Sequence, residues 1–162
     1  MMQTDVKSAH IMAGTSGLAF AGRTRLRGAV VSNTTSGTPA NIMFANNVAI
    51  TGTYSITLTV CTVTVAAGHG LATGARVFLD FTTGSGADNI YVVTSTGVTT
   101  FTVVVPSATT SGDVSIYAQT LMEIDITNSV PVNVIIPGEG IIANDGIYVG
   151  TPANIAATVF YG

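Results

Sequence analysis

The sequence predicts an all-β protein: a β-sandwich, jelly-roll-like in arrangement, that is interrupted by an inserted small β-barrel domain. Valine, isoleucine and threonine dominate the chain, and these residues favour strands. Turn residues recur at short intervals between the apolar runs, as is typical of sandwiches and barrels. No stretch of the 162 residues combines helical periodicity with helix caps.

Two strands are expected near the N-terminus. The segment "TDVKSAHIMAG" alternates weakly between apolar and polar residues, and "RTRLRG" follows it. Because successive side chains of a strand point to opposite faces, the three arginines of "RTRLRG" are predicted to share one face. They are Arg23, Arg25 and Arg27, with Thr24, Leu26 and Gly28 on the other face. The segment "SNTTSGTPANIMFANN" is typical of a turn followed by a short strand.

Short amphipathic strands fill the middle of the chain. In "TLTVCTVTVAAG" the side chains of Cys61, Val63 and Val65 fall on one face and the threonines on the other. "TTFTVVVPS" and "GDVSIYAQ" repeat this alternation. The segments "TTGSGADN", "TSTG" and "ATTSGD", which lie between them, are interpreted as turns.

The last third of the chain is expected to hold two more strands around an "IPGEG" turn. In "TLMEIDIT" the acidic residues Glu123 and Asp125 share one face with Leu121, and the remaining apolar residues share the opposite face. "NIAATVFYG" alternates as far as Tyr161, which predicts a final strand tied into a sheet.

A change in residue composition and pattern along the sequence divides the chain into two predicted domains. Residues 57–117 form a self-contained series of short strands and are predicted to be the inserted β-barrel, projecting outward. Residues 1–56 and 118–162 hold the arginine cluster, the acidic strand and the "IPGEG" turn, and are predicted to form one sandwich. Insertion at an exposed loop tip is a tolerated way to combine two such domains.

Composition excludes several classes of function. Charged residues make up only 8% of the chain, against roughly 25% in typical globular proteins, which favours a permanent component of an assembly. The net charge of −3 argues against binding nucleic acid. No window of about 18 apolar residues predicts a membrane span, and "MMQTDVKSAH" lacks the features of a signal peptide.

No enzyme activity, catalytic residue, metal site, cofactor or small-molecule substrate is predicted. Cys61 is the only cysteine, so an intrachain disulfide and a thiolate cluster are excluded. His69 lies between glycines and is interpreted as a turn residue whose ring bonds nearby backbone; His10 is likewise not expected to be catalytic. A hydrolase would need two carboxylates placed as an acid and a base, and the sequence shows no such pair. The aspartates of the middle segment also match no calcium-binding loop; they are Asp80, Asp88 and Asp113.

The arginine stripe has two competing interpretations. It can pair within the chain with the strand that carries Glu123 and Asp125, which would give cross-strand charge pairs. Alternatively, one of these stripes meets a neighbouring subunit, where bidentate arginine–carboxylate contacts set the register. We therefore take Arg23, Arg25, Arg27, Glu123 and Asp125 as candidate partner-interface residues. Without interleaved aromatic residues the stripe makes a poor nucleic-acid surface.

The outer parts of the chain resemble a family of short structural proteins from marine tailed phages. Four motifs carry the resemblance in the same order: Thr4–Ala9, Phe20–Val31, Ile136–Ile141 and Val159–Gly162. The middle resembles a second module, a small β-barrel-like unit that recurs in phage virion proteins. Its matching positions are His69–Leu71, Gly74, Val77, Phe81, Tyr91–Thr94, Phe101–Val103 and Thr109–Val114.

These resemblances imply a virion structural protein on the exterior of a phage capsid, of the decoration, cement or knob type. The implied partners are the major capsid protein and copies of the chain itself, as a homotrimer. The chain would be made in the host cytoplasm and located on the capsid surface. The alternative is a tail component, such as a fibre, baseplate or adaptor subunit, that contacts a host receptor or glycan.

Overall fold

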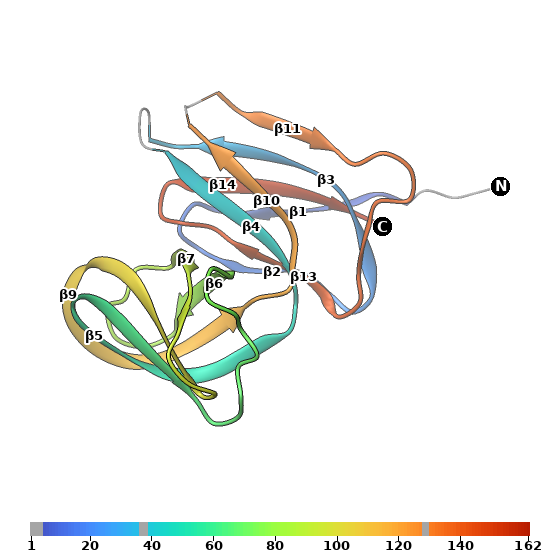
Figure 1. Cartoon of the computed structure of the whole chain (residues 1–162). Helices are drawn as coiled ribbons and strands as arrows, with labels where there is room; N and C mark the ends of the chain where they lie inside the picture. Colours follow the sequence, from blue (N-terminus) through green and yellow to red (C-terminus); the bar gives the residue numbers. More distant parts are fainter. Residues whose placement is uncertain (1–4, 36–38, 128–129) are drawn as a thin grey trace. The chain divides into compact units, whose positions relative to one another are not determined.

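The chain folds into antiparallel strands, which confirms the all-β prediction (Figure 1). The structure is a computed structural model that describes residues 5–35, 39–127 and 130–162. The chain divides into two compact units. An outer unit comprises Met1–Asn47 with Thr120–Gly162, and an inserted unit comprises Val48–Gln119.

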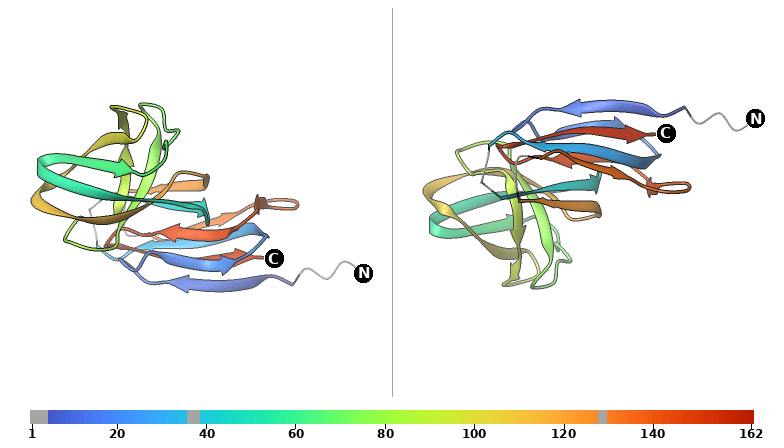
Figure 2. Two further views of the ribbon diagram at one scale, coloured as in Figure 1. Left: turned by 90° about the horizontal axis from the view of Figure 1, so that it is seen from below. Right: turned by 90° about the horizontal axis from the view of Figure 1, so that it is seen from above.

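The outer unit is a sandwich of two sheets, which Figure 2 shows edge-on as two layers. Strand order in the first sheet is β1 (Lys7–Ile11), β14 (Ile155–Tyr161), β3 (Thr24–Asn33) and β11 (Val132–Ile135), with β12 (Ile141–Ala143) also pairing with β3. Strand order in the second is β10 (Thr120–Ile126), β4 (Ala40–Asn46), β13 (Gly146–Gly150) and β2 (Gly17–Ala21).

One apolar core lies between these two sheets. The alternation predicted for the final strand is confirmed, because Ile155, Ala157 and Val159 are buried in this core. Burying apolar side chains from both inner faces is what holds two such sheets together. The other buried members of the core are Ile11, Leu26, Ala29, Val31, Ile42, Phe44, Ile126, Ala143, Ile147 and Val149.

Strand β3 changes phase at Arg27. Leu26 is buried in the core, but the next core residue is Ala29, three positions further on instead of two. The register with β14 shifts between Leu26 and Gly28, so Arg27 is the extra residue of a β-bulge. Gly28 consequently lines an outer groove together with Arg27. The prediction that Gly28 lies on the face opposite the arginines is therefore wrong.

The inserted unit is one sheet that curls around its own core (Figure 1). Two long strands dominate it: β5 (Ala49–Val65) pairs with β9 (Thr100–Tyr117) along almost its whole length. The sheet continues from β9 to β6 (Arg76–Phe81) and β7 (Asn89–Val92), and β8 (Thr94–Ser95) also pairs with β9. The register shifts between Leu58 and Val60, and Leu58 there has a positive φ of 56°.

Two sequence predictions for this unit are wrong in detail. Residues 108–113, interpreted as a turn, lie within β9 and pair residue by residue with Thr53–Leu58. Their small polar residues resemble a turn, but the continuous partner strand keeps them extended. The predicted domain boundary between residues 56 and 57 falls inside β5, whereas the inserted unit begins at Val48.

Alternating side chains fill the core of the inserted unit. Cys61, Val63 and Val65 are buried while Thr62 and Thr64 are exposed, as their alternation predicted. Burial raises the pKa of the Cys61 thiol to about 11, because the thiolate is poorly solvated there. Burial likewise raises the pKa of Tyr91 to about 12, and its hydroxyl donates to the Ala87 carbonyl at 2.6 Å.

We predict that the Cys61 thiol is unreactive in the folded chain. At pH 8 its pKa of about 11 leaves very little thiolate, and burial blocks access, so a disulfide reagent should react at least about a hundredfold more slowly than with the urea-unfolded chain. Absorbance of the released thiolate measures both rates. Equal rates in the two states would contradict the packing of this core.

Candidate partner interface

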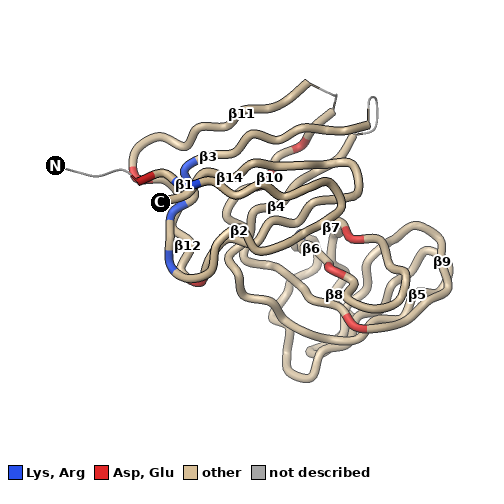
Figure 3. The backbone as a smooth tube through the Cα atoms, turned by 180° about the vertical axis from the view of Figure 1, so that it is seen from behind, with Lys and Arg blue, Asp and Glu red and all other residues tan. Residues whose placement is uncertain are grey.

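Four of the five cationic residues of the chain gather at one end of the outer unit (Figure 3). We call this group, Lys7, Arg23, Arg25 and Arg27, the cationic end. Lys7 begins β1, and Arg25 and Arg27 lie on β3. Arg23 lines two neighbouring surface cavities. Arg23 lies in the bend before β3, so the prediction that it shares a strand face with the other two arginines is wrong.

The β11–β12 turn "IPGEG", residues 136–140, packs against the arginines. Arg27 Nη1 donates to the Gly138 carbonyl at 2.9 Å, and Arg25 Nη1 donates to the Glu139 carbonyl at 3.4 Å. The backbone N–H of Ile136 also donates to the Arg27 carbonyl at 2.9 Å. These contacts fix the two long side chains on the surface of the sheet, which lowers the entropy that a binding event would otherwise cost.

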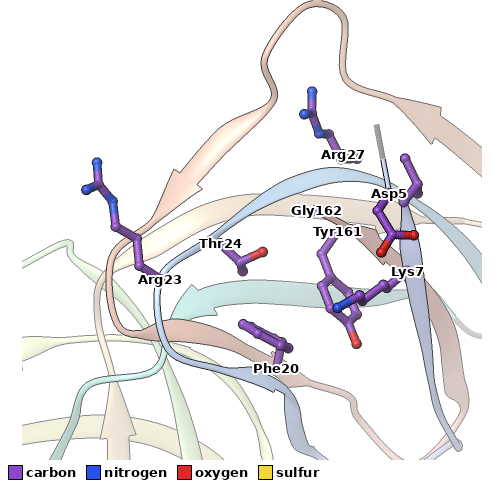
Figure 4. A pocket seen from close by; sticks show the side chains of 9 residues that line it. Asp5, Lys7, Phe20, Arg23, Thr24, Arg27, Tyr161 and Gly162 are labelled. Carbon is purple, nitrogen blue, oxygen red and sulfur yellow. The ribbon is translucent and has the colours of Figure 1, made fainter. Parts of the chain in front are cut away.

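A cavity of about 330 Å³ opens between the arginines (Figure 4). Lys7, Arg23 and Arg27 line it together with the hydroxyl-bearing Thr24, and Asp5 is the acidic member of the lining. The rings of Phe20 and Tyr161, whose centroids are 4.9 Å apart, form an aromatic wall. Cationic groups beside an aromatic wall suit an anionic protein side chain.

The arginines keep hydrogen-bonding capacity for a partner. Within the described part of the chain, neither Arg23 nor Arg25 nor Arg27 forms an ion pair. Arg27 Nε is buried without a hydrogen-bond partner, so only the terminal nitrogens of Arg27 can meet an incoming carboxylate. A guanidinium carries five N–H donors, and only one nitrogen each of Arg25 and Arg27 is engaged by the turn. A carboxylate can therefore be bound by two parallel hydrogen bonds.

The acidic stripe lies in the other sheet. Glu123 and Asp125 are on β10, which pairs with β4, whereas Arg25 and Arg27 are on β3, which pairs with β14, β11 and β12. The interpretation that the two stripes pair with each other within the chain is therefore wrong. Strand pairing is decided by long-range topology, which complementary charge in the sequence does not specify.

The faces of β10 follow the predicted alternation with one exception. Met122, Ile124 and Ile126 pack on the core, while Asp125 is exposed. Leu121 was predicted to share the acidic face but packs against the core. A register shift between Thr120 and Met122 turns its side chain inward.

His69 serves the fold, as interpreted from its flanking glycines. Its buried ring accepts the Leu71 N–H at Nδ1 at 3.0 Å and donates from Nε2 to the Gly97 carbonyl at 2.9 Å, so it ties two turns together. In the exposed His10 side chain, Nδ1 lies 3.1 Å from the hydroxyl oxygen of Thr158.

Two aspartates of the middle segment make structural contacts. Asp88 accepts the Phe81 N–H at 2.8 Å. Burial raises the pKa of Asp88, the Phe81 hydrogen bond lowers it and repulsion by Asp80 raises it further. Asp113 accepts the Thr83 hydroxyl at 3.4 Å. In residues 5–35, 39–127 and 130–162, no three acidic, histidine or cysteine side chains gather where they could hold a metal ion.

Sequence reasoning missed two features of the cationic end. Lys7 comes from a distant strand, which reaches the arginines because it pairs with β14, with Lys7 opposite Tyr161. The hydrogen bonds from Arg25 and Arg27 to the turn at residues 136–140 were also missed, although "IPGEG" was recognised as a turn. Its contact with β3 could have been found only by pairing the flanking strands correctly.

Comparison with known proteins gives no match, either to a protein-family model or to a curated protein. No helix in the described part of the chain is long and apolar enough to cross a membrane.

We predict that Gly140 is required to hold the turn against β3. It has a φ of +76°, and a Cβ at this position would lie 2.5 Å from the Leu26 carbonyl oxygen. Gly138 is a matched control, because its φ is +68° but a Cβ would meet nothing within 4 Å. Gly138→Ala should cost about 1–2 kcal/mol of unfolding free energy, and Gly140→Ala about 1–3 kcal/mol more.

Urea unfolding followed by circular dichroism measures both variants. Equal destabilisation by the two substitutions would mean that the turn does not pack closely against β3 at Gly140.

Proposed function

We propose that this chain is a non-enzymatic structural protein of a virion, which decorates or cements the exterior of a phage capsid through contacts between subunits. The observation that carries the proposal is the cationic end: a chain with only five cations places four of them around one surface. Arg25 and Arg27 are held there by backbone carbonyls, and none of the three arginines has a carboxylate partner among the described residues.

The rest of the molecule is consistent with this role. The motif "FAGRTRLRGAVV", by which the outer parts resemble phage structural proteins, supplies β3 and its arginines, and "IPGEGI" supplies the turn that clasps them. Residues 5–9 of the "TDVKSA" motif run into β1, while Thr4 lies outside the described residues. All four motifs thus meet at the cationic end, because Tyr161 and Gly162 of "VFYG" line the cavity there.

Shell stabilisation follows from repeated contacts. A specific contact buries about 1,200–2,000 Å², and many symmetric copies on one particle act together by avidity. Low charge elsewhere on the chain reduces the desolvation cost of packing it against neighbouring subunits. The proposed partners are the major capsid protein and copies of the chain itself, in a trimeric assembly.

A tail component is the second candidate, and one observation favours it. The inserted unit carries an exposed apolar group: Val60 and Val104 are cross-strand partners, 47% and 77% exposed, and Leu58 nearby is 68% exposed. A subunit that contacts a host receptor or glycan would use such a face. Copy number per particle separates the two roles, since hundreds of copies indicate the shell and a few indicate the tail.

We predict that Arg25→Ala/Arg27→Ala weakens binding to particles while the isolated chain stays folded. The double variant loses the guanidinium groups but only two surface hydrogen bonds, so unfolding free energy should fall by less than about 2 kcal/mol. Co-sedimentation with capsids that lack the native protein measures binding. Thr62→Ala/Thr64→Ala, at exposed positions of the inserted unit, is the control.

If the arginine variant bound particles as tightly as the native chain, the cationic end would not be part of the interface. Capsids without the chain should also lose resistance to heat, and capsids that remain equally robust would contradict the cement role.

A further inference from the structure

An apolar groove of about 420 Å³ lies on the outer face of the first sheet of the outer unit. Strand register defines its centre, because Gly28 of β3 lies opposite both Phe160 of β14 and Ile135 of β11. Gly28 has no side chain, so the two large apolar side chains flank an open gap. Val30, further along β3, and Val6, which precedes β1, extend the apolar lining.

The groove presents apolar side chains that the described chain leaves uncovered. Ile135 is 78% exposed and Val6 is 51% exposed. Exposed apolar groups that gather on one surface are typical of interaction sites. An apolar side chain placed between them would remove their surface from water and so stabilise a complex.

The groove adjoins the cavity of the cationic end. Val6 and Arg27 line both hollows. The cavity adds Lys7 and Arg23, whose side chains are exposed. A ligand that fills the groove as far as Arg27 therefore meets positive charge, and charge complementarity selects an acidic group at that point.

One polar side chain in the groove favours a polypeptide ligand over a fatty acid. Asn133 pairs with Val30 across β11 and β3, and it is exposed and lines the groove. Its amide offers a donor and an acceptor, which match the C=O and N–H of an extended backbone; an alkyl chain would cover the amide without bonding it. β11 is also an edge strand, paired only with β3 among the described residues, and edge strands commonly bind extended segments.

We propose that the groove and the cationic cavity together bind an extended segment of a partner protein in which an apolar side chain stands beside an aspartate or glutamate. The apolar side chain lies between Phe160 and Ile135, and the carboxylate is bound by the cations that line the cavity. The inference rests on the proposed function only for the source of the segment, a neighbouring protein of the particle. It adds an apolar anchor to the ionic contacts of the cationic end.

Selection of short random peptides on the purified full-length chain tests the chemistry of the ligand without particles. The enriched peptides should share an apolar residue next to aspartate or glutamate. The proposal is overturned if no peptide is enriched, or if the enriched peptides lack either the apolar or the acidic residue. Binding of dodecanoate with no peptide enriched would assign the groove to a fatty acid and would also overturn it.

Fluorescence anisotropy of a labelled enriched peptide then locates the site. Ile135→Ser should weaken binding by about tenfold, because an exposed apolar contact is lost. Val104→Ser is the matched control, since Val104 is 77% exposed on the inserted unit, and it should leave binding unchanged. Lys7→Ser/Arg23→Ala should weaken binding by about tenfold and make it less sensitive to salt. Circular dichroism checks that each variant folds.

The remaining outcomes separate this inference from the proposed function. Peptide binding as tight as native in either the Ile135 or the Lys7/Arg23 variant overturns the inference. Self-association of the native chain that Ile135→Ser abolishes would show that a second copy covers the groove, which overturns it as well. Native-like particle binding by Ile135→Ser contradicts the inference but not the proposed function, whereas peptide binding by a chain that is absent from particles contradicts the proposed function alone.

Discussion

Strand β3 is paired along both of its edges, and the features of the cationic end depend on that double pairing. β14 pairs along one edge, and β11 and β12 pair along the other. With both edges occupied, the strand cannot slip, so Leu26 stays in the core and Arg25 stays outside it. The bulge at Arg27 and the turn between β11 and β12 fall at the same point, and there the turn carbonyls engage the guanidinium groups.

This arrangement separates the two tasks of the strand. The inner face contributes Leu26, Ala29 and Val31 to packing, which stabilises the sandwich. The outer face holds cations that the described chain does not neutralise with ion pairs. Surface ion pairs contribute little to the stability of a monomer, so arginines there are better explained by contacts with other chains. A preorganised guanidinium then gives such a contact its geometry and specificity.

The alternation of apolar and polar residues predicted those strands and buried faces that depend only on neighbouring residues in the chain. Alternation at Cys61, Val63 and Val65 identified both a strand and its buried face, since the period of a strand fixes side-chain direction. It failed at Gly28 and Leu121, where bulges shift the phase. It also failed at residues 108–113, where the long partner strand overrides turn-like composition. The partner of each charged strand could not be predicted, because that depends on the topology of the whole sandwich.

The central claim is that the outward arginines of β3 exist to bind carboxylates of neighbouring subunits. A reconstruction of the assembled particle in which side chains are visible tests it most directly. The account predicts the guanidinium groups of Arg25 and Arg27 in hydrogen-bond contact with carboxylates of an adjacent chain. Guanidinium groups that face open solvent in every copy on the particle, with contacts made only by the inserted unit, would contradict it.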